Sequence, residues 1–76
     1  MPDMEDTTIR ELDTIALTID VPADGLIRGS VGTVVQLYSP HEFEVEFLDN
    51  DGRTYALATL KDDQLLRLNF DPIVAA

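Results

Sequence analysis

One run of six residues constrains the fold of this chain more than any other stretch. Residues 42–47, Glu-Phe-Glu-Val-Glu-Phe, alternate between acidic and apolar side chains without a break. A period of two is typical of a β-strand with one face buried and one face in water. The run therefore predicts a strand whose apolar members line a core: Phe43, Val45 and Phe47. Its acidic members then share the outer face: Glu42, Glu44 and Glu46.

The residues after this strand predict a tight turn. Asp49-Asn50-Asp51-Gly52-Arg53 suits a three-residue hairpin loop with Gly52 in the left-handed conformation and Asp49 opposite Arg53. Counting outward pairs Phe47 with Tyr55, Val45 with Leu57 and Phe43 with Thr59 on the core face, and Glu46 with Ala56 and Glu44 with Ala58 on the outer face. A two-residue Asp-Gly loop is the alternative. It sets Phe47 beside Ala56 and loses an aromatic pair, so we favour the first register.

Further strands are expected on both sides of this hairpin. Ile15, Leu17 and Ile19 alternate with smaller residues in a first strand, and Pro22 to Gly25 breaks it. Leu26 and Ile27 are expected to cover an open end of the structure. A second strand begins at the two glycines of Gly29-Ser30-Val31-Gly32, where a positive φ or a close backbone approach is needed, and turns Val35 and Leu37 inward, with Val34 if a bulge lies near it.

The end of the chain completes the expected fold. Residues 61–65 have an acidic start and an apolar end, which indicates a single 3₁₀ turn before a short last strand, Leu66 to Asn69. The chain is therefore predicted to be all-β, a small SH3-like five-stranded antiparallel barrel with one 3₁₀ turn before the last strand. The 76 residues make one domain, with an acidic tail at residues 1–11, the barrel at 12–69 and a C-terminal tail at 70–76.

Composition limits the partners and the location. Fifteen acidic residues against five basic ones give a net charge of −10, and the basic residues are scattered singly. Phosphate backbones and anionic membranes should be repelled, because binding to them draws on clustered Lys and Arg. No apolar run approaches the length of a membrane span, and the first residues are acidic, so a cytoplasmic location is expected. The absence of cysteine excludes disulfides and thiolate chemistry.

The residues offer little catalytic chemistry, and we expect no enzyme, no metal site and no cofactor. His41 stands beside Pro40 in a predicted turn, which favours a solvated loop residue. Gly29 and Gly32 lack the remaining residues of a phosphate-binding loop. The Asp49 to Asp51 stretch resembles half of a calcium loop, but the position of the required glutamate falls on Leu60.

Several segments together carry a resemblance to a known family: Leu12 to Leu17, Pro22, Gly25-Leu26, Gly29 to Val35, Phe43 to Phe47, Asp51 to Thr54, and Leu60 with Asp63-Gln64-Leu65. They resemble the small bacterial family described as domain of unknown function 4926 (DUF4926), over roughly residues 11–68. The resemblance implies an SH3-like barrel and no particular activity. The segment from Gly29 to Val35 is also similar to the opening of other SH3-like barrels, including ribosomal and transcription-factor modules that bind RNA or protein.

The outer face of the central strand is the remaining candidate site. Its three glutamates are either a solvated face that discourages aggregation or a docking surface for a basic protein. In the second case Ala56 and Ala58 leave the surface flat, and Tyr38 and Tyr55 are candidate aromatic anchors. We expect a non-enzymatic protein-interaction module with an acidic surface, either an antitoxin-like or immunity-like inhibitor or a small subunit of a complex. The alternatives are an SH3-like module that binds nucleic acid and a protein that mimics nucleic acid.

Overall fold

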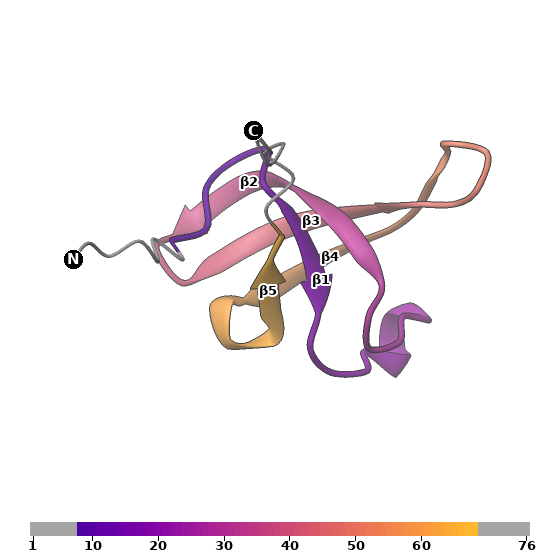
Figure 1. Cartoon of the computed structure of the whole chain (residues 1–76), viewed down its shortest axis with the longest axis horizontal. Helices are drawn as coiled ribbons and strands as arrows, with labels where there is room; N and C mark the ends of the chain where they lie inside the picture. The colour runs from indigo at the N-terminus through magenta and orange to yellow at the C-terminus, as the bar shows by residue number, and fades with distance from the viewer. Residues whose placement is uncertain (1–7, 69–76) are drawn as a thin grey trace, which may run out of the picture.

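The computed structural model describes residues 8–68, which form one antiparallel sheet of five strands in the order β4-β3-β2-β1-β5 (Figure 1). The strands are β1 (Thr14–Leu17), β2 (Val31–Ser39), β3 (Glu42–Leu48), β4 (Thr54–Lys61) and β5 (Leu65–Arg67). The 3₁₀ turns are η1 (Pro22–Asp24) and η2 (Asp62–Gln64). The predictions of an all-β antiparallel sheet and of a 3₁₀ turn before the last strand are confirmed. The turn η1 was not expected from the sequence.

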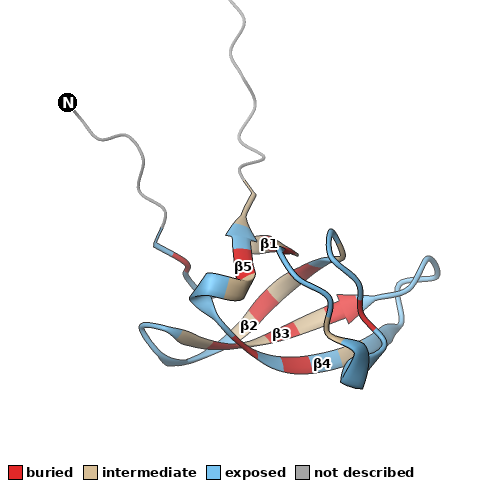
Figure 2. Cartoon of the chain, turned by 90° about the horizontal axis from the view of Figure 1, so that it is seen from below, coloured by how far each residue is buried: buried red, intermediate tan, exposed pale blue. Residues whose placement is uncertain are grey.

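The core is built from one face of each strand together with two residues outside the strands. Buried positions alternate with half-buried ones along β1 and β3. Figure 2 shows buried bands side by side on the neighbouring strands β2, β3 and β4. The buried side chains are Ile9, Ile15, Leu17, Leu26, Val34, Phe43, Val45, Phe47, Ala58, Leu60 and Leu65. Within residues 8–68 no polar or charged residue is buried, so the described core is entirely apolar.

The predicted alternation of β3 is confirmed. Phe43, Val45 and Phe47 are buried, and the residues between them are half-buried on the other face. β3 lies between β2 and β4, so its apolar face is enclosed by neighbours on both sides. This strand therefore fixes which face of the sheet is the core.

The hairpin turn is as predicted, but the register beyond it is not. Gly52 has a φ of 80°, and the Asp49 amide donates to the Arg53 carbonyl at 2.8 Å. Leu48 then pairs with Thr54, whereas Phe47 pairs with Ala56. Tyr55 is an extra residue between these pairs, which makes a β-bulge. The expected pairing of Phe47 with Tyr55 is therefore wrong.

The bulge reverses which residues of β4 face the core and which face outward. Ala58 lies opposite Val45 and Leu60 lies opposite Phe43, and both are buried. The expected register would have put Thr59 against Phe43 instead. The observed register gives the two phenylalanines of β3 small or flexible apolar neighbours and keeps a hydroxyl out of the core. Leu57 and Tyr55 are exposed as a result.

A second irregularity lies in β2. The pairing with β3 shifts between Val34 and Gln36, and Val34 is buried while Val35 is half-buried. The expectation of an inward Val34 beside a bulge is confirmed, but Leu37 is exposed rather than inward. Similarly, of the two residues expected to cover an open end, Leu26 is buried and Ile27 is exposed.

The ends of the described segment bear on the predicted tails. Ile9 is buried and belongs to the core, although the sequence analysis places it in the N-terminal tail. Asn69, the expected end of the last strand, and the expected C-terminal tail lie outside the described residues, as do residues 1–7. The predicted domain boundaries stay predictions. In the part of the chain that is described, no helical segment is long and apolar enough to cross a bilayer.

The two glycines before and within β2 have the two roles expected of them. Gly29 has a φ of 91°, which only glycine adopts without strain. Gly32 is buried, and a Cβ placed on it would lie 2.8 Å from the Glu46 carbonyl oxygen and 2.9 Å from Cδ2 of Phe47. β2 therefore packs against β3 at a distance that leaves no room for a side chain at residue 32.

This close approach predicts the effect of Gly32→Ala. The added methyl group meets backbone as well as side-chain atoms of β3, so we expect the free energy of unfolding to fall by roughly 1–3 kcal/mol. Gln36→Ala, at an exposed position of the same strand, should change it by no more than about 0.5 kcal/mol. Urea unfolding of both variants checks this. Equal stability of the two variants would contradict the packing described here.

Candidate protein-binding face

The candidate site is the glutamate row, defined as Glu42, Glu44 and Glu46 on the outer face of β3. The alternation of β3 places these side chains opposite the buried aromatic face. The bulge in β4 decides what lies beside them: Glu42 faces Lys61, Glu44 faces Thr59 and Glu46 faces Leu57. On its β4 side the row is therefore flanked by one cation, one hydroxyl and one exposed apolar side chain, and on its β2 side by polar residues.

Hydroxyl groups hold the carboxylates in place. Thr59 donates its hydroxyl to Oε1 of Glu44 at 2.8 Å, and Tyr38 donates to the same atom at 3.3 Å. Thr54 donates to Oε2 of Glu46 at 2.5 Å. These bonds restrict the rotamers of both glutamates and leave the second carboxylate oxygen of each for another donor. Glu44 and Glu46 form no ion pair within residues 8–68.

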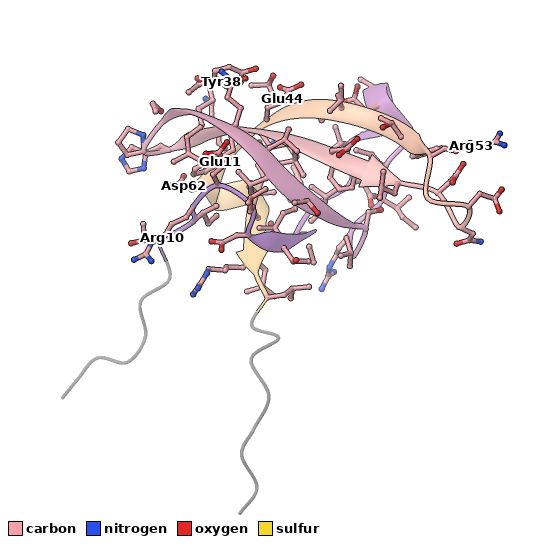
Figure 3. All side chains as sticks on the ribbon, turned by 90° about the horizontal axis from the view of Figure 1, so that it is seen from above. Arg10, Glu11, Tyr38, Glu44, Arg53 and Asp62 are labelled. Carbon is pink, nitrogen blue, oxygen red and sulfur yellow. The ribbon has the colours of Figure 1, made fainter. Side chains whose placement is uncertain are left out.

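Tyr38 lies beside the row, as Figure 3 shows for its ring and Glu44. Tyr38 as a residue is 51% exposed. Partial loss of water around the phenol, followed by the charge and the hydrogen bond of Glu44 and then the charge of Glu42, raises the pKa of Tyr38 above its ordinary value. The phenol therefore stays a neutral hydrogen-bond donor to the row up to a higher pH than an unperturbed tyrosine would.

Tyr55, the other expected anchor, reaches a different part of the molecule. Its hydroxyl donates to the Gly25 carbonyl at 2.9 Å, directly after η1. Its neighbour Thr54 is the residue that bonds to Glu46. The structure thus brings Tyr38 to the glutamate row and turns Tyr55 toward the loop between β1 and β2.

The expectation of a flat surface formed by alanines is wrong. Ala58 is buried and Ala56 packs against the core, because the bulge shifts the register by one residue. The residues that take their place are Leu57 and Thr59, which sequence reasoning missed together with Thr54. Nothing in the local pattern of β4 distinguishes its two faces, since leucine occurs in both phases.

The basic residues do not gather on the glutamate row. Figure 3 shows Arg10 and Arg53 at opposite ends of the molecule. The Arg67 Nε lies 3.1 Å from Oδ2 of Asp13, at the β1–β5 edge of the sheet. Lys61 is the cation that the register places beside the row. The potential over Glu44 and Glu46 is therefore set mainly by carboxylates.

The other candidates have structural surroundings. Nδ1 of His41 lies 2.6 Å from Oδ2 of Asp62 on the protein surface, where it links the β2–β3 turn to η2. Oδ1 of Asp49 accepts hydrogen bonds from the amides of Asp51 and Arg53, which fixes the β3–β4 turn. Among residues 8–68 no group of three or more His, Cys, Asp or Glu side chains is arranged to hold a metal ion.

Taken together, the row can accept hydrogen bonds from cations. Carboxylates fixed on a strand lose little conformational entropy when a guanidinium or ammonium group binds. Arginine can also use two donors at once on a carboxylate. The row lies on one face of a strand, so its carboxylates are able to meet such groups on a surface rather than in a pocket.

Comparison with known families gives the following result. The model of the family described as Domain of unknown function (DUF4926) matches residues 11–67, which is most of the chain. Searches of curated proteins and of solved structures found no significant match.

The Tyr38–Glu44 contact predicts a coupled titration. In a Tyr55→Phe background, which leaves Tyr38 as the one tyrosine, Glu44→Gln should lower the pKa of Tyr38 toward its ordinary value. Glu46→Gln is the matched control, because Glu46 bonds to Thr54 instead. The phenolate absorbance during an alkaline titration measures this. An unchanged titration in Glu44→Gln would contradict the contact.

The same pKa shift predicts a loss of stability at high pH. Because folding raises the pKa of Tyr38, the folded chain binds its phenolic proton more tightly than the unfolded chain does. This contribution is fully present below the unfolded pKa of about 10 and is lost as the pH rises through the folded value. Urea unfolding below about pH 10 and again above it should show a smaller fall in the free energy of unfolding for Tyr38→Phe than for the parent chain. Equal losses would contradict the prediction.

Proposed function

The chain belongs to the DUF4926 family, and from that premise we propose that it is a non-enzymatic protein-interaction module whose glutamate row binds a basic surface of another protein. The description of the family names no activity, so support for the proposal comes from the geometry of this chain. The role that fits best is that of an inhibitor, similar to an antitoxin or immunity protein, or of a small subunit in a larger complex.

We also assign the chain to the SH3-like barrels. The support is the strand order: β1 to β4 follow one another across the sheet, and β5 returns to pair with β1. The 3₁₀ turn η2 stands between β4 and β5, as expected for that fold. A fold of this kind serves many functions, so it does not by itself select a partner.

The observation that carries the functional proposal is that Glu44 and Glu46 are held in place by hydrogen bonds and form no ion pair within residues 8–68. Alternate residues of a strand are about 7 Å apart, so the three glutamates offer a regular series of acceptors. Two of them are held by hydroxyl donors rather than by cations. A partner that supplies Arg or Lys side chains at a similar spacing gains charge-assisted hydrogen bonds at little entropic cost.

A nucleic-acid-binding role is the weaker alternative. Binding to phosphate requires clustered positive charge, but Arg10 and Arg53 lie at opposite ends of the molecule. The net charge of −10 also opposes the approach of any polyanion. Mimicry of nucleic acid remains compatible with an acidic row, since it too requires a basic protein partner.

Capture of partners from the native host tests these roles. The tagged full chain is used as bait, and bound material is eluted with rising salt, because contacts between surface charges weaken as salt screens them. A basic protein released by salt supports the proposal, and a nuclease or polymerase among such proteins would favour mimicry. Recovery of nucleic acid in place of a protein would overturn the proposal of a protein-interaction module.

A charge reversal locates the binding surface. Glu44→Lys with Glu46→Lys should keep the β-sheet spectrum and weaken binding of the captured partner by about 10-fold to 100-fold, because attraction becomes repulsion at the centre of the row. Asp24→Lys with Asp63→Lys is the matched control: it makes the same change in net charge at exposed positions of η1 and η2. If both double variants bind the partner equally well, the glutamate row is not the binding surface.

A further inference from the structure

We propose that the free edge of β4 binds an extended basic segment of the partner protein as an additional strand, an inference that rests on the proposed function above. β4 is the last strand in the order of the sheet, and Figure 2 shows no described strand on its far side. The part of this edge that we consider lies at Leu57 and Thr59, in the middle of β4. Strand addition draws its affinity from backbone hydrogen bonds and its specificity from side chains.

A backbone hydrogen bond at the end of the β3–β4 ladder shows which groups of β4 face the edge. The Asp62 amide donates to the His41 carbonyl at 3.0 Å. Hydrogen-bonded pairs alternate with non-hydrogen-bonded pairs along an antiparallel ladder. Counting back from Asp62, Leu60 and Ala58 are the residues that bond to β3. The alternate residues turn their N–H and C=O groups toward the free edge: Leu57, Thr59 and Lys61.

Two of these three residues have open backbone groups. The Lys61 amide donates to Oε1 of Gln64 at 2.8 Å, which agrees with its pointing away from β3. Within residues 8–68, no backbone hydrogen bond joins Leu57 or Thr59 to an element on the far side of β4. Their two donors and two acceptors are therefore available to an extended chain.

The middle of β4 also lacks the features that protect most edge strands. Edge strands are commonly very short, or they carry charged residues, proline or a bulge. β5, at the opposite edge of the sheet, has three residues and includes Arg67. β4 has eight residues, and the stretch from Thr54 to Leu60 contains no charge and no proline. Its bulge lies at the start of the strand, before Leu57. The backbone of β4 beyond the bulge is thus suited to pairing.

The glutamate row selects the charge of the added strand. Residues of that strand opposite Leu57 and Thr59 have their side chains on the outer face of the sheet, which is the face of the row. Glu44 and Glu46 accept hydrogen bonds from the hydroxyls of Thr59 and Thr54, so their carboxylates lie on the β4 side of the row. The added strand would lie about 10 Å from β3, and a long Lys or Arg side chain crosses that gap to a carboxylate. The ligand is thus an extended segment with Lys or Arg at alternate positions.

The same charges disfavour a second copy of the chain as the occupant. The stretch from Thr54 to Leu60 would bring no cation to the glutamates of another copy. Each copy also has a net charge of −10, which opposes close approach. A basic partner meets neither obstacle.

Hydrogen exchange, followed by two-dimensional NMR of the full chain, tests this inference. We would add Arg-Val-Arg-Val-Arg, the same peptide with a methyl group on every internal amide nitrogen, and Glu-Val-Glu-Val-Glu. In the free chain the amides of Leu57 and Thr59 should exchange faster than those of Ala58 and Leu60, which bond to β3. The first peptide should slow exchange at Leu57 and Thr59. It should bind about tenfold more tightly than the methylated peptide, which lacks the donors for the edge, and the acidic peptide should not bind.

A pair of variants at one position tests the edge from the side of the protein. Leu57→Pro removes an edge donor without removing a bond to β3, and should weaken the first peptide by about fivefold. Leu57→Ala is the matched control, because it shortens the same side chain but keeps the N–H group, and its affinity should stay within about twofold of the parent. The methylated peptide makes the equivalent comparison on the unaltered chain.

The outcomes separate this inference from the proposed function. If both basic peptides bind equally and shift only the amides of the row, the edge is not the binding site, whereas the proposed function stands. If the acidic peptide also slows exchange at Leu57 and Thr59, the charge of the ligand is wrong and the inference is overturned. Slower exchange there with rising concentration of the chain alone would assign the edge to a second copy and would also overturn the inference. If no peptide affects the row or the edge, both the inference and the proposed function are overturned.

Discussion

β3 lies between β2 and β4, and the burial of Phe43, Val45 and Phe47 on one of its faces determines the rest of the sheet. Side chains of a strand alternate, so a slip of one residue would turn three carboxylates into the core. Each buried, unpaired carboxylate costs several kcal/mol, which a domain of this size cannot tolerate. The glutamate row is therefore a geometric consequence of the core. Its chemistry depends on which residues the neighbouring strands place beside it.

A bulge in β4 decides which residues lie beside the row. The turn pairs Asp49 with Arg53, and continued without interruption this register would put Phe47 beside Tyr55. Packing of the core instead requires Phe47 beside Ala56, and the bulge makes both pairings possible. The sequence shows the turn clearly, because Gly52 and the flanking acids have local roles. It does not show the bulge, because that choice depends on the fit of Ala58 and Leu60 against side chains of another strand. Local pairing preferences favoured Phe47 beside Tyr55, and core packing overrode them.

The candidate site was predictable to the same extent as the fold. The outward glutamates follow from alternation alone, whereas the sequence does not distinguish Tyr38 from Tyr55 as the tyrosine beside the row. The hydroxyl donors Thr54 and Thr59 were missed because their place beside the row follows from the bulge. The same bulge turns Tyr55 away from the row and toward the Gly25 carbonyl. The side-chain alternation of β3 is thus predictable from the sequence, whereas the residues that β4 places beside it depend on a bulge that only tertiary packing determines.

The acidic charge and the exposed apolar side chains act in opposite directions on self-association. Exposed apolar residues such as Val31, Leu48 and Tyr55 would by themselves favour association with any apolar surface, including that of a second copy. Two copies each carry a charge of −10, however, and they repel one another once they approach within about a Debye length, roughly 8 Å at physiological salt. A basic partner meets attraction over the same distance. The carboxylates therefore oppose self-association through the exposed apolar side chains, whereas a surface of opposite charge is able to approach closely.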